Sequence, residues 1–94
     1  MGDRIFGVHV SDWPQGEPRC AGDRRTCGSG IIELPGLFAA FEAAGYEAAY
    51  CLEIFSADHL PDSLWHQPAA DVIVKNREGF EAAWHGRIDH AFGR

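Results

Sequence analysis

Two strand-like segments alternate with two helix-like segments along the chain, and this order limits the fold more than any other feature. Residues 4–11 alternate apolar and polar side chains, and residues 48–55 form a short apolar run typical of a buried strand. Residues 34–44 and 69–86 carry apolar side chains at helical spacing. Because a helix lies between the two strands, we predict an α/β fold, a βαβα unit with parallel strands.

The first helix has sequence signals at both of its ends. Pro35 suits a first helical turn, and Gly45 suits the position after the last turn. The second helix is expected to stop near residue 86, with a frayed tail from residue 87 onward. The apolar stripes expected to face the core are Leu34, Leu37, Phe38 and Phe41 in the first helix, and Val72, Ile73, Phe80, Ala83 and Trp84 in the second.

The segments 12–32 and 56–68 are predicted to be loops. The first is unusually long for a small domain, and such loops tend to be functional or disordered. It is net positive because it contains Arg19, Arg24 and Arg25, whose guanidinium groups suit phosphate or carboxylate. The stretch "CGSG" at residues 27–30 adds backbone that can approach an anion closely.

Composition narrows the class of protein. The formal net charge of −6 disfavours a nucleic-acid partner. We find no apolar run long enough for a membrane span and no secretory signal, so we expect a cytoplasmic protein without membrane contact. Cys20, Cys27 and Cys51 form no CxxC pair and are expected to be reduced thiols, with Cys51 in the core.

Candidate site residues follow both strands at the same end. His9 and Asp12 end the first strand, and Glu53 ends the second. Ligands bind at this end of parallel strands, and histidine with glutamate suits a divalent metal ion. Simpler interpretations are a histidine bonded to a loop carbonyl, an aspartate that caps a turn, and a salt bridge from Glu53 to Arg24 or Arg25.

Several other polar or aromatic residues are expected to have ordinary structural roles. Arg19 and Arg25 are expected to be solvated. Trp65 and Trp84 are expected to be packing anchors. The histidines expected at the surface are His59, His66, His85 and His90.

The stretches "VHVSDW" and "GDRRTCGSGIIELPGLFAAFEAAGYEAAYCLEIFS" resemble the sugar phosphate isomerase/epimerase family, the xylose isomerase-like TIM barrels. The resemblance covers residues 4–86 and matches the last quarter of that barrel. It implies that residues 1–94 form a single partial domain, a βαβα fragment containing the last two βα units. The strand at 4–11 would be the seventh barrel strand, and the strand at 48–55 the eighth.

The resemblance also implies roles for individual residues. His9 and Glu53 would be two of four ligands of a divalent metal, namely manganese, zinc, cobalt or magnesium. Glu53 would also be a catalytic acid/base. Arg24 and Asp12 would contact a sugar or sugar-phosphate substrate.

A complete barrel needs eight strands, so the 94-residue chain alone is expected to be inactive. Its expected partners are a second copy or the missing part of the barrel, because an exposed sheet edge invites pairing. Two alternatives stay open from the sequence. One is a non-enzymatic interaction or assembly module, and the other is an orphan fragment that binds a metal or an anion.

Overall fold

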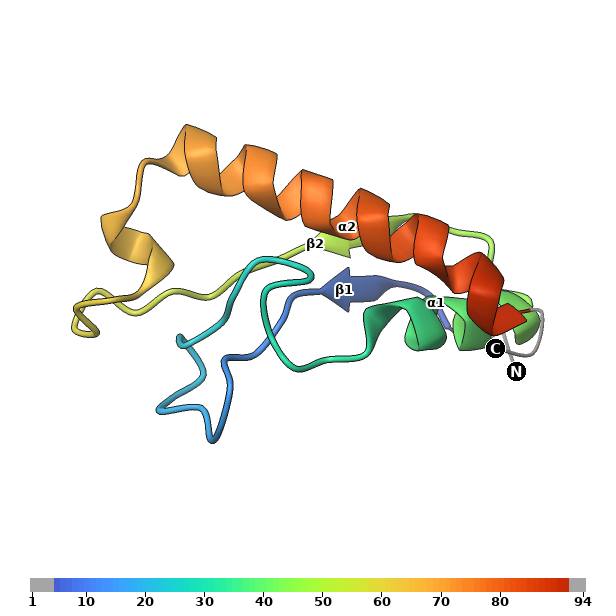
Figure 1. Ribbon diagram of the computed structural model, residues 1–94, viewed down its shortest axis with the longest axis horizontal. Coiled ribbons are helices and arrows are strands. Elements are labelled where there is room, and N and C mark those ends of the chain that lie inside the picture. The colour runs from blue at the N-terminus through green and yellow to red at the C-terminus, as the bar shows by residue number, and fades with distance from the viewer. Residues whose placement is uncertain (1–4, 92–94) are drawn as a thin grey trace.

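The computed structural model describes residues 5–91 as two strands and two long helices in the order βαβα. Strand β1 spans Val8–Val10, helix α1 Leu34–Ala43, strand β2 Tyr50–Leu52 and helix α2 Ala69–Ala91. A short 3-10 helix, Leu64–His66, precedes α2 (Figure 1). The predicted order of elements and the α/β class are therefore confirmed.

The two strands pair in parallel, as predicted, with Val8 opposite Tyr50 and Val10 opposite Leu52. Both point toward the end of the molecule that carries the long loops (Figure 1). Side chains alternate between the faces of a strand. The four residues just named therefore share the face that packs against the helices, while His9 and its register partner Cys51 lie on the opposite face.

Helices α1 and α2 cover one face of this sheet and enclose an aromatic core. Phe38 of α1 is almost completely buried at its centre. Its ring centroid lies 5.4 Å from that of Tyr50, 5.2 Å from Phe80 and 5.7 Å from Trp84. Aromatic rings in tilted and edge-on contacts at these distances stabilise the core more than burial of their surface area alone would. Trp84 is thus a packing residue, as predicted.

Helix α1 ends as the sequence predicts. The Glu33 carboxylate accepts the N–H of Gly36 at 2.6 Å at the N-terminus. Gly45 follows the helix with φ of 93°, and the N–H of Tyr46 donates to the carbonyl of Phe41 at 3.0 Å. A left-handed glycine with this bond pattern satisfies the last carbonyl groups of a helix.

Both strands are shorter than the predicted segments 4–11 and 48–55; residue 4 lies outside the described residues. At their C-terminal ends, the reason is a loop segment that lies between the chain segments following each strand. Asp12 and Arg25 exchange backbone hydrogen bonds of 3.0 and 2.8 Å in an antiparallel bridge. Asp23 forms a second antiparallel bridge to Ser56 after β2. Direct β1–β2 pairing therefore stops early.

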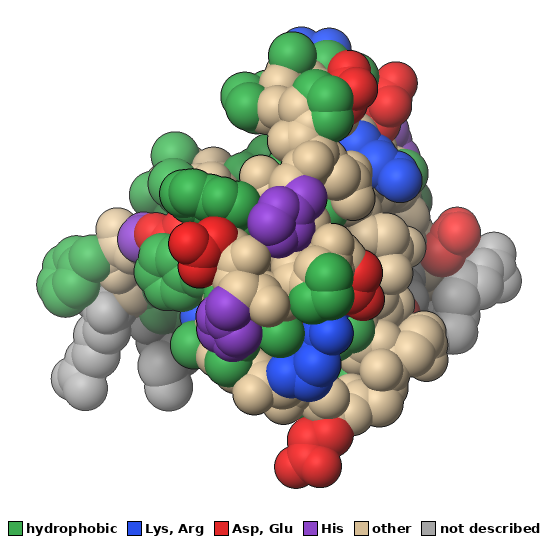
Figure 2. Space-filling view, turned by 90° about the vertical axis from the view of Figure 1, so that its left-hand side faces the viewer, with side chains coloured by type: hydrophobic (Ala, Val, Ile, Leu, Met, Phe, Trp, Pro, Cys, Tyr) green, Lys and Arg blue, Asp and Glu red, His purple; other side chains and the backbone are tan. Residues whose placement is uncertain are grey.

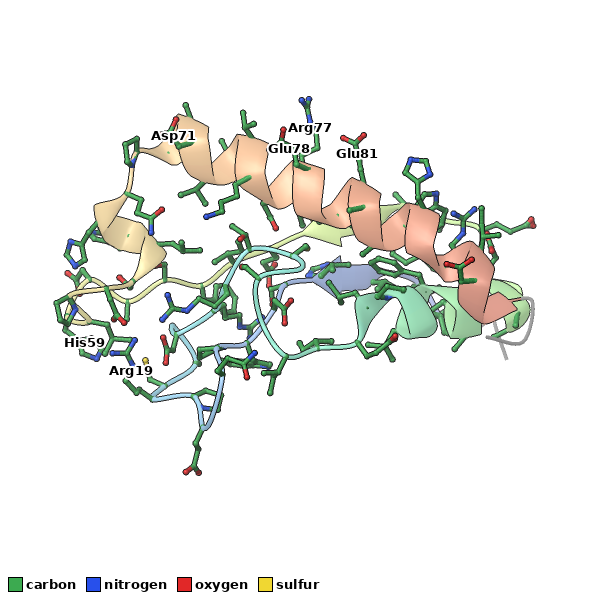
Figure 3. The ribbon with its side chains drawn as sticks, in the orientation of Figure 1. Arg19, His59, Asp71, Arg77, Glu78 and Glu81 are labelled. Carbon is green, nitrogen blue, oxygen red and sulfur yellow. The ribbon has the colours of Figure 1, made fainter. Side chains whose placement is uncertain are left out.

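Helix α2 continues to Ala91, so the expected fraying is wrong for residues 87–91; residues 92–94 lie outside the described part. Arg87 stabilises this end. Its guanidinium lies 3.8 Å from the ring centroid of Trp84, and its Nε lies 3.1 Å from Oε1 of Glu42 on α1. On the other side of the helix, charged side chains point away from the sheet (Figure 3), namely Asp71, Arg77, Glu78 and Glu81.

Several expected core residues are exposed. Cys51 lies at the surface because residues 5–91 place no layer over its face of the sheet. Trp65, Leu37 and Ile73 are also exposed, beside the two edges of the sheet that no other strand within residues 5–91 pairs with. The predictions for these four residues are wrong in this chain. No helix among the described residues is long and apolar enough to cross a bilayer.

Candidate functional site

The fold brings His9 and Glu53 together at the C-terminal ends of the strands. Nδ1 of His9 lies 3.1 Å from Oε2 of Glu53, with side-chain exposures of 61% and 35%. Glu53 follows Cys51 by two positions, so strand alternation puts it on the same face as His9. Glu53 therefore pairs with His9, rather than with Arg24 or Arg25 as one interpretation of the sequence expected.

An imidazole and a carboxylate are suitable ligands for a divalent ion. The short distance between His9 and Glu53 allows both to face one ion, and their exposure leaves room for further ligands. Within residues 5–91, no group of three or more His, Cys, Asp or Glu side chains could hold a metal. A catalytic metal site commonly has three protein ligands, and this pair would supply two of them. The pair therefore fits a metal site in part.

Arg24 lies over the ends of both strands. Its Cζ is 4.7 Å from the ring centroid of Phe55 and 5.1 Å from that of Trp13. Its Nη1 lies 3.4 Å from Oγ of Ser11. Ser11 and Phe55 each come two positions after a member of the His9–Glu53 pair. The guanidinium therefore lies just beyond that pair along the strands.

Arg19 and Arg25 are engaged in an ion-pair network. The Arg19 side chain is exposed, as expected, but Arg25 is only 22% exposed, so the expectation that it is solvated is wrong. Nη2 of Arg19 lies 2.9 Å from Oδ1 of Asp23, and Nη2 of Arg25 lies 3.2 Å from the same oxygen. Both arginines also reach Asp62 in the second loop, at 2.7 and 3.7 Å. The hydrogen bonds from Arg19 hold the pKa of the buried Asp23 well below its usual range.

This network separates Arg24 from the other two arginines of the loop. Among the residues that the structure describes, Arg24 has no carboxylate partner. Its polar contacts are the neutral oxygens of Ala21 and Ser11. The positive charge of Arg24 is thus available for an anion.

Asp12 is fully buried, and its carboxylate accepts four backbone N–H groups. Oδ1 accepts from Trp13 and Ile32, both at 2.9 Å. Oδ2 accepts from Gly28 at 3.0 Å and Gly30 at 3.1 Å. An ionised carboxylate has about four such acceptor positions. The geometry therefore favours the turn-capping interpretation of Asp12, with its oxygens occupied by the loop.

The glycine-rich stretch packs against α2, and the backbone N–H groups of residues 27–30 are already bonded within the protein. The N–H of Cys27 donates to Oδ1 of Asn76 at 2.8 Å. A β-carbon on Gly79 would lie 1.8 Å from the carbonyl oxygen of Cys27. Burial raises the pKa of the Cys27 thiol to about 11. Sequence reasoning missed this contact, although the polar Asn76 and Gly79 inside a helical stretch mark it.

The loops after both strands form one end of the molecule. Acidic, basic, histidine and hydrophobic side chains lie intermixed on this end (Figure 2). Arg19 and His59 both lie there (Figure 3). This loop end, with its mixed surface, lies at the opposite side of the strands from the aromatic core.

Two parallel strands with helices on one face and a polar pair at their C-terminal ends are features of part of an α/β barrel. The family model of the xylose isomerase-like TIM barrel matches residues 1–81, and the chain belongs to this family. Its fold is that of a βαβα portion of the barrel.

One solved structure gives a direct comparison, the crystal structure of protein SMc04130 from Sinorhizobium meliloti 1021. It is 34% identical to this chain, with a TM-score of 0.73 over 86% of this chain. The chain spans only 28% of the length of that protein. No curated protein matches the chain.

Proposed function

We propose that this chain supplies the seventh and eighth βα units of a divalent-metal-dependent sugar or sugar-phosphate isomerase or epimerase. The observation that carries the proposal is the His9–Glu53 contact of 3.1 Å at the C-terminal ends of two parallel strands. Active sites of TIM barrels lie at this end of the strands. Membership of the xylose isomerase-like family supports the same assignment.

His9 and Glu53 would hold the metal, which would be manganese, zinc, cobalt or magnesium. When bound, such an ion polarises the carbonyl and hydroxyl oxygens of a sugar. The Glu53 carboxylate would take a proton from the carbon beside the carbonyl group and return it at the neighbouring carbon, which is an isomerisation. Epimerisation would need a second acid on the opposite face, which would come from another part of the barrel. His9 keeps Glu53 oriented through their mutual contact.

Arg24 would bind an anionic group of the substrate, as a sugar phosphate provides. Two observations support this role. Its charge has no carboxylate partner within residues 5–91, and the rings of Trp13 and Phe55 hold the guanidinium beside the strand ends. Arginine binds phosphate oxygens in a forked geometry. Asp12 would support the substrate site indirectly, by fixing the loop that carries Arg24.

The isolated chain would bind metal weakly and would not turn over sugar, because it provides two of the ligands that such a site needs. Calorimetric titration of the chain with Mn²⁺, Zn²⁺, Co²⁺ and Mg²⁺ tests the ligand assignment. We expect His9→Ala to weaken binding by about tenfold or more. The exposed His85 provides the matched control, and His85→Ala is expected to leave the affinity unchanged.

Equal affinity of His9→Ala and the unchanged chain would remove His9 as a ligand. An assay of aldose–ketose interconversion with added Mn²⁺ tests inactivity, and robust turnover by the purified monomer would contradict it. The proposed location of the protein is the cytoplasm, where Cys20, Cys27 and Cys51 would stay reduced.

The second candidate function is an assembly module, which the exposed apolar residues beside both sheet edges favour. Metal titration distinguishes this candidate, because a pure assembly module would show no binding that depends on His9.

A further inference from the structure

The stretch from Gly22 to Arg24 is paired with the chain segment that follows β2. The N–H of Ala57 donates to the carbonyl of Gly22 at 2.8 Å, and the N–H of Arg24 donates to the carbonyl of Phe55 at 3.4 Å. Between these two bonds lies Asp23, in an antiparallel bridge to the same segment. A β-carbon on Gly22 would lie 2.9 Å from the backbone nitrogen of Ala57, so the two segments are in close contact. The backbone of Arg24 is therefore tied to the segment that carries Phe55.

Side chains alternate between the two faces of such an extended stretch, so Asp23 and Arg24 point in opposite directions. The Arg24 guanidinium lies over the rings of Trp13 and Phe55, beside the ends of the strands. The Asp23 side chain, which is only 2% exposed, lies on the other face, where it contacts Arg25. The alternation therefore presents Arg24 to the strand ends and turns Arg25 to the opposite face.

The Asp23 carboxylate gathers two arginines on its own face. Arg19 donates to it three times, from its backbone N–H at 3.0 Å, from Nε at 3.0 Å and from Nη2 at 2.9 Å. Arg25 donates through Nη2 at 3.2 Å, and Asp62 is the second carboxylate that both arginines reach. Arg19 lies at the outer end of the loops (Figure 3). Two carboxylates thus offset two guanidinium groups, while within residues 5–91 the charge of Arg24 has no such partner.

We infer that Asp23 is a positioning residue for anion binding by Arg24. Its carboxylate bonds to Arg19 before Arg24 in the chain and to Arg25 after it, so the backbone is fixed on both sides of Arg24. The guanidinium of Arg24 can then stay over its two rings before an anion arrives. The inference deepens the proposed function and rests on it, because Arg24 is there the residue that binds the anionic group of the substrate. Asp23 acts through Arg24 and does not touch the anion.

Charge alone and positioning predict opposite effects of Asp23→Asn on anion binding. The substitution removes a negative charge and weakens the hold on Arg19 and Arg25, so an effect of charge alone would strengthen anion binding. Loss of positioning would weaken it, because the ordering of Arg24 would become a cost of binding. We expect Asp23→Asn to weaken anion binding by about fivefold or more.

Titration of the chain with sulfate provides the test. Sulfate has the tetrahedral oxygens of a phosphate group, and its charge does not change near neutral pH. Binding is followed at constant ionic strength by the NMR shifts of the Ser11 and Phe55 backbone amides. Asp62→Asn is the matched control, since it removes the same charge from the same cluster at a side chain that is 62% exposed. We expect this control to change the sulfate affinity by less than about twofold.

The side-chain protons of Arg24 give a second readout, which a loss of stability alone would not move. Because the guanidinium lies over two aromatic rings, ring currents shift these protons upfield in the folded chain. We expect Asp23→Asn to reduce this shift while the signals of Phe38 in the core stay unchanged. Unchanged or stronger sulfate binding by folded Asp23→Asn would overturn the inference. Equal weakening by Asp62→Asn would also overturn it.

Hydrogen exchange in the unchanged chain tests the same coupling without a variant. If Arg24 binds an anion only while the Asp23 cluster is intact, the anion must stabilise that cluster in return. The amides of Arg19 and Asp23 should then exchange about tenfold more slowly at a sulfate concentration of about ten times Kd. The amide of Gly36 at the start of α1, outside both loops, is the control and should keep its rate. Unchanged exchange at Arg19 and Asp23 would overturn the inference even where Asp23→Asn fails to fold.

Arg24→Gln distinguishes failure of this inference from failure of the proposed function. Weaker sulfate binding by Arg24→Gln, together with unchanged binding by Asp23→Asn, would reject the role of Asp23 and keep Arg24 as the anion-binding residue. Unchanged binding by Arg24→Gln would reject the anion-binding role of Arg24, and the inference with it.

Discussion

The carboxylate of Asp12 lies so close to Gly30 that this glycine has no room for a side chain. Oδ2 of Asp12 accepts the Gly30 N–H at 3.1 Å. A β-carbon on Gly30 would lie 2.5 Å from Oδ1 of the same carboxylate and 1.9 Å from the carbonyl oxygen of Trp13. The buried Asp12 carboxylate therefore fixes the long first loop, residues 12–32, by close contact with the backbone at Gly30.

Gly30→Ala is expected to destabilise the chain by at least about 2 kcal/mol, because the clash is with backbone that cannot move without breaking the Asp12 bonds. Urea unfolding measures the free energy of unfolding. Gly7→Ala is the control, since a β-carbon there meets nothing within 4 Å and its effect is expected to be small. Equal stability of Gly30→Ala and the unchanged chain would contradict this account of the loop.

Asp12→Asn is expected to cost about 2 kcal/mol of unfolding free energy, because the amide nitrogen cannot accept the two N–H groups that one carboxylate oxygen now accepts. The same urea unfolding measures this loss. Asp58→Asn, at an exposed position in the second loop, should have little effect. Similar losses of unfolding free energy for the two variants would show that the four hydrogen bonds to Asp12 do not cause the loss.

The stability of the chain is expected to fall as the pH drops below about 4, which is the ordinary pKa of an aspartate. Hydrogen bonds from Arg19 lower the pKa of both Asp23 and Asp62 in the folded chain. A lowered folded pKa gives stability that is present above the unfolded pKa and is lost as the pH falls toward the folded pKa. Urea unfolding at pH 7 and at several values below 4 should show the decline.

The control for this pH dependence is Asp23→Asn, which removes the group with the strongest lowering. Its stability deficit relative to the unchanged chain should shrink as the pH falls, since protonation removes the same charge from Asp23. A deficit that stays constant from pH 7 downward would show that the charge of Asp23 does not stabilise the fold.

Tyr50→Phe is expected to leave the stability unchanged or to raise it by up to about 1 kcal/mol, because the Tyr50 hydroxyl is buried without a partner in the described residues. The same burial raises the pKa of Tyr50. Tyr46→Phe is the matched comparison. The Tyr46 hydroxyl donates to the carbonyl of Ala49, so this variant is expected to lose about 1 kcal/mol. Thermal unfolding followed by circular dichroism compares the two, and a larger loss for Tyr50→Phe would contradict the assignment.

Local sequence signals were sufficient for the order of elements and for both ends of α1. Pro35 and Gly45 act through neighbouring backbone alone, so their effect is visible in the sequence. The meeting of His9 and Glu53 was also predictable, because parallel strands bring their C-terminal ends to one edge.

Contacts between distant segments were not predictable. Nothing local to Arg19 indicates that it reaches Asp62, 43 positions away. The strand ends depend on the bridge from Asp12 to Arg25, which is likewise set by the folded loop. For Cys51, a short apolar run does not indicate which face of a strand another layer will cover.

The shared contacts of Asp62 have a dynamic consequence. This residue receives Arg19 and Arg25 from the first loop while it belongs to the second. Neither loop can swing outward without stretching ion pairs that also restrain the other. Amide hydrogens in residues 12–32 and 56–63 should therefore exchange with solvent through one concerted opening, at a common free energy. The two loops would then behave as a single cooperative unit at the mouth of the site.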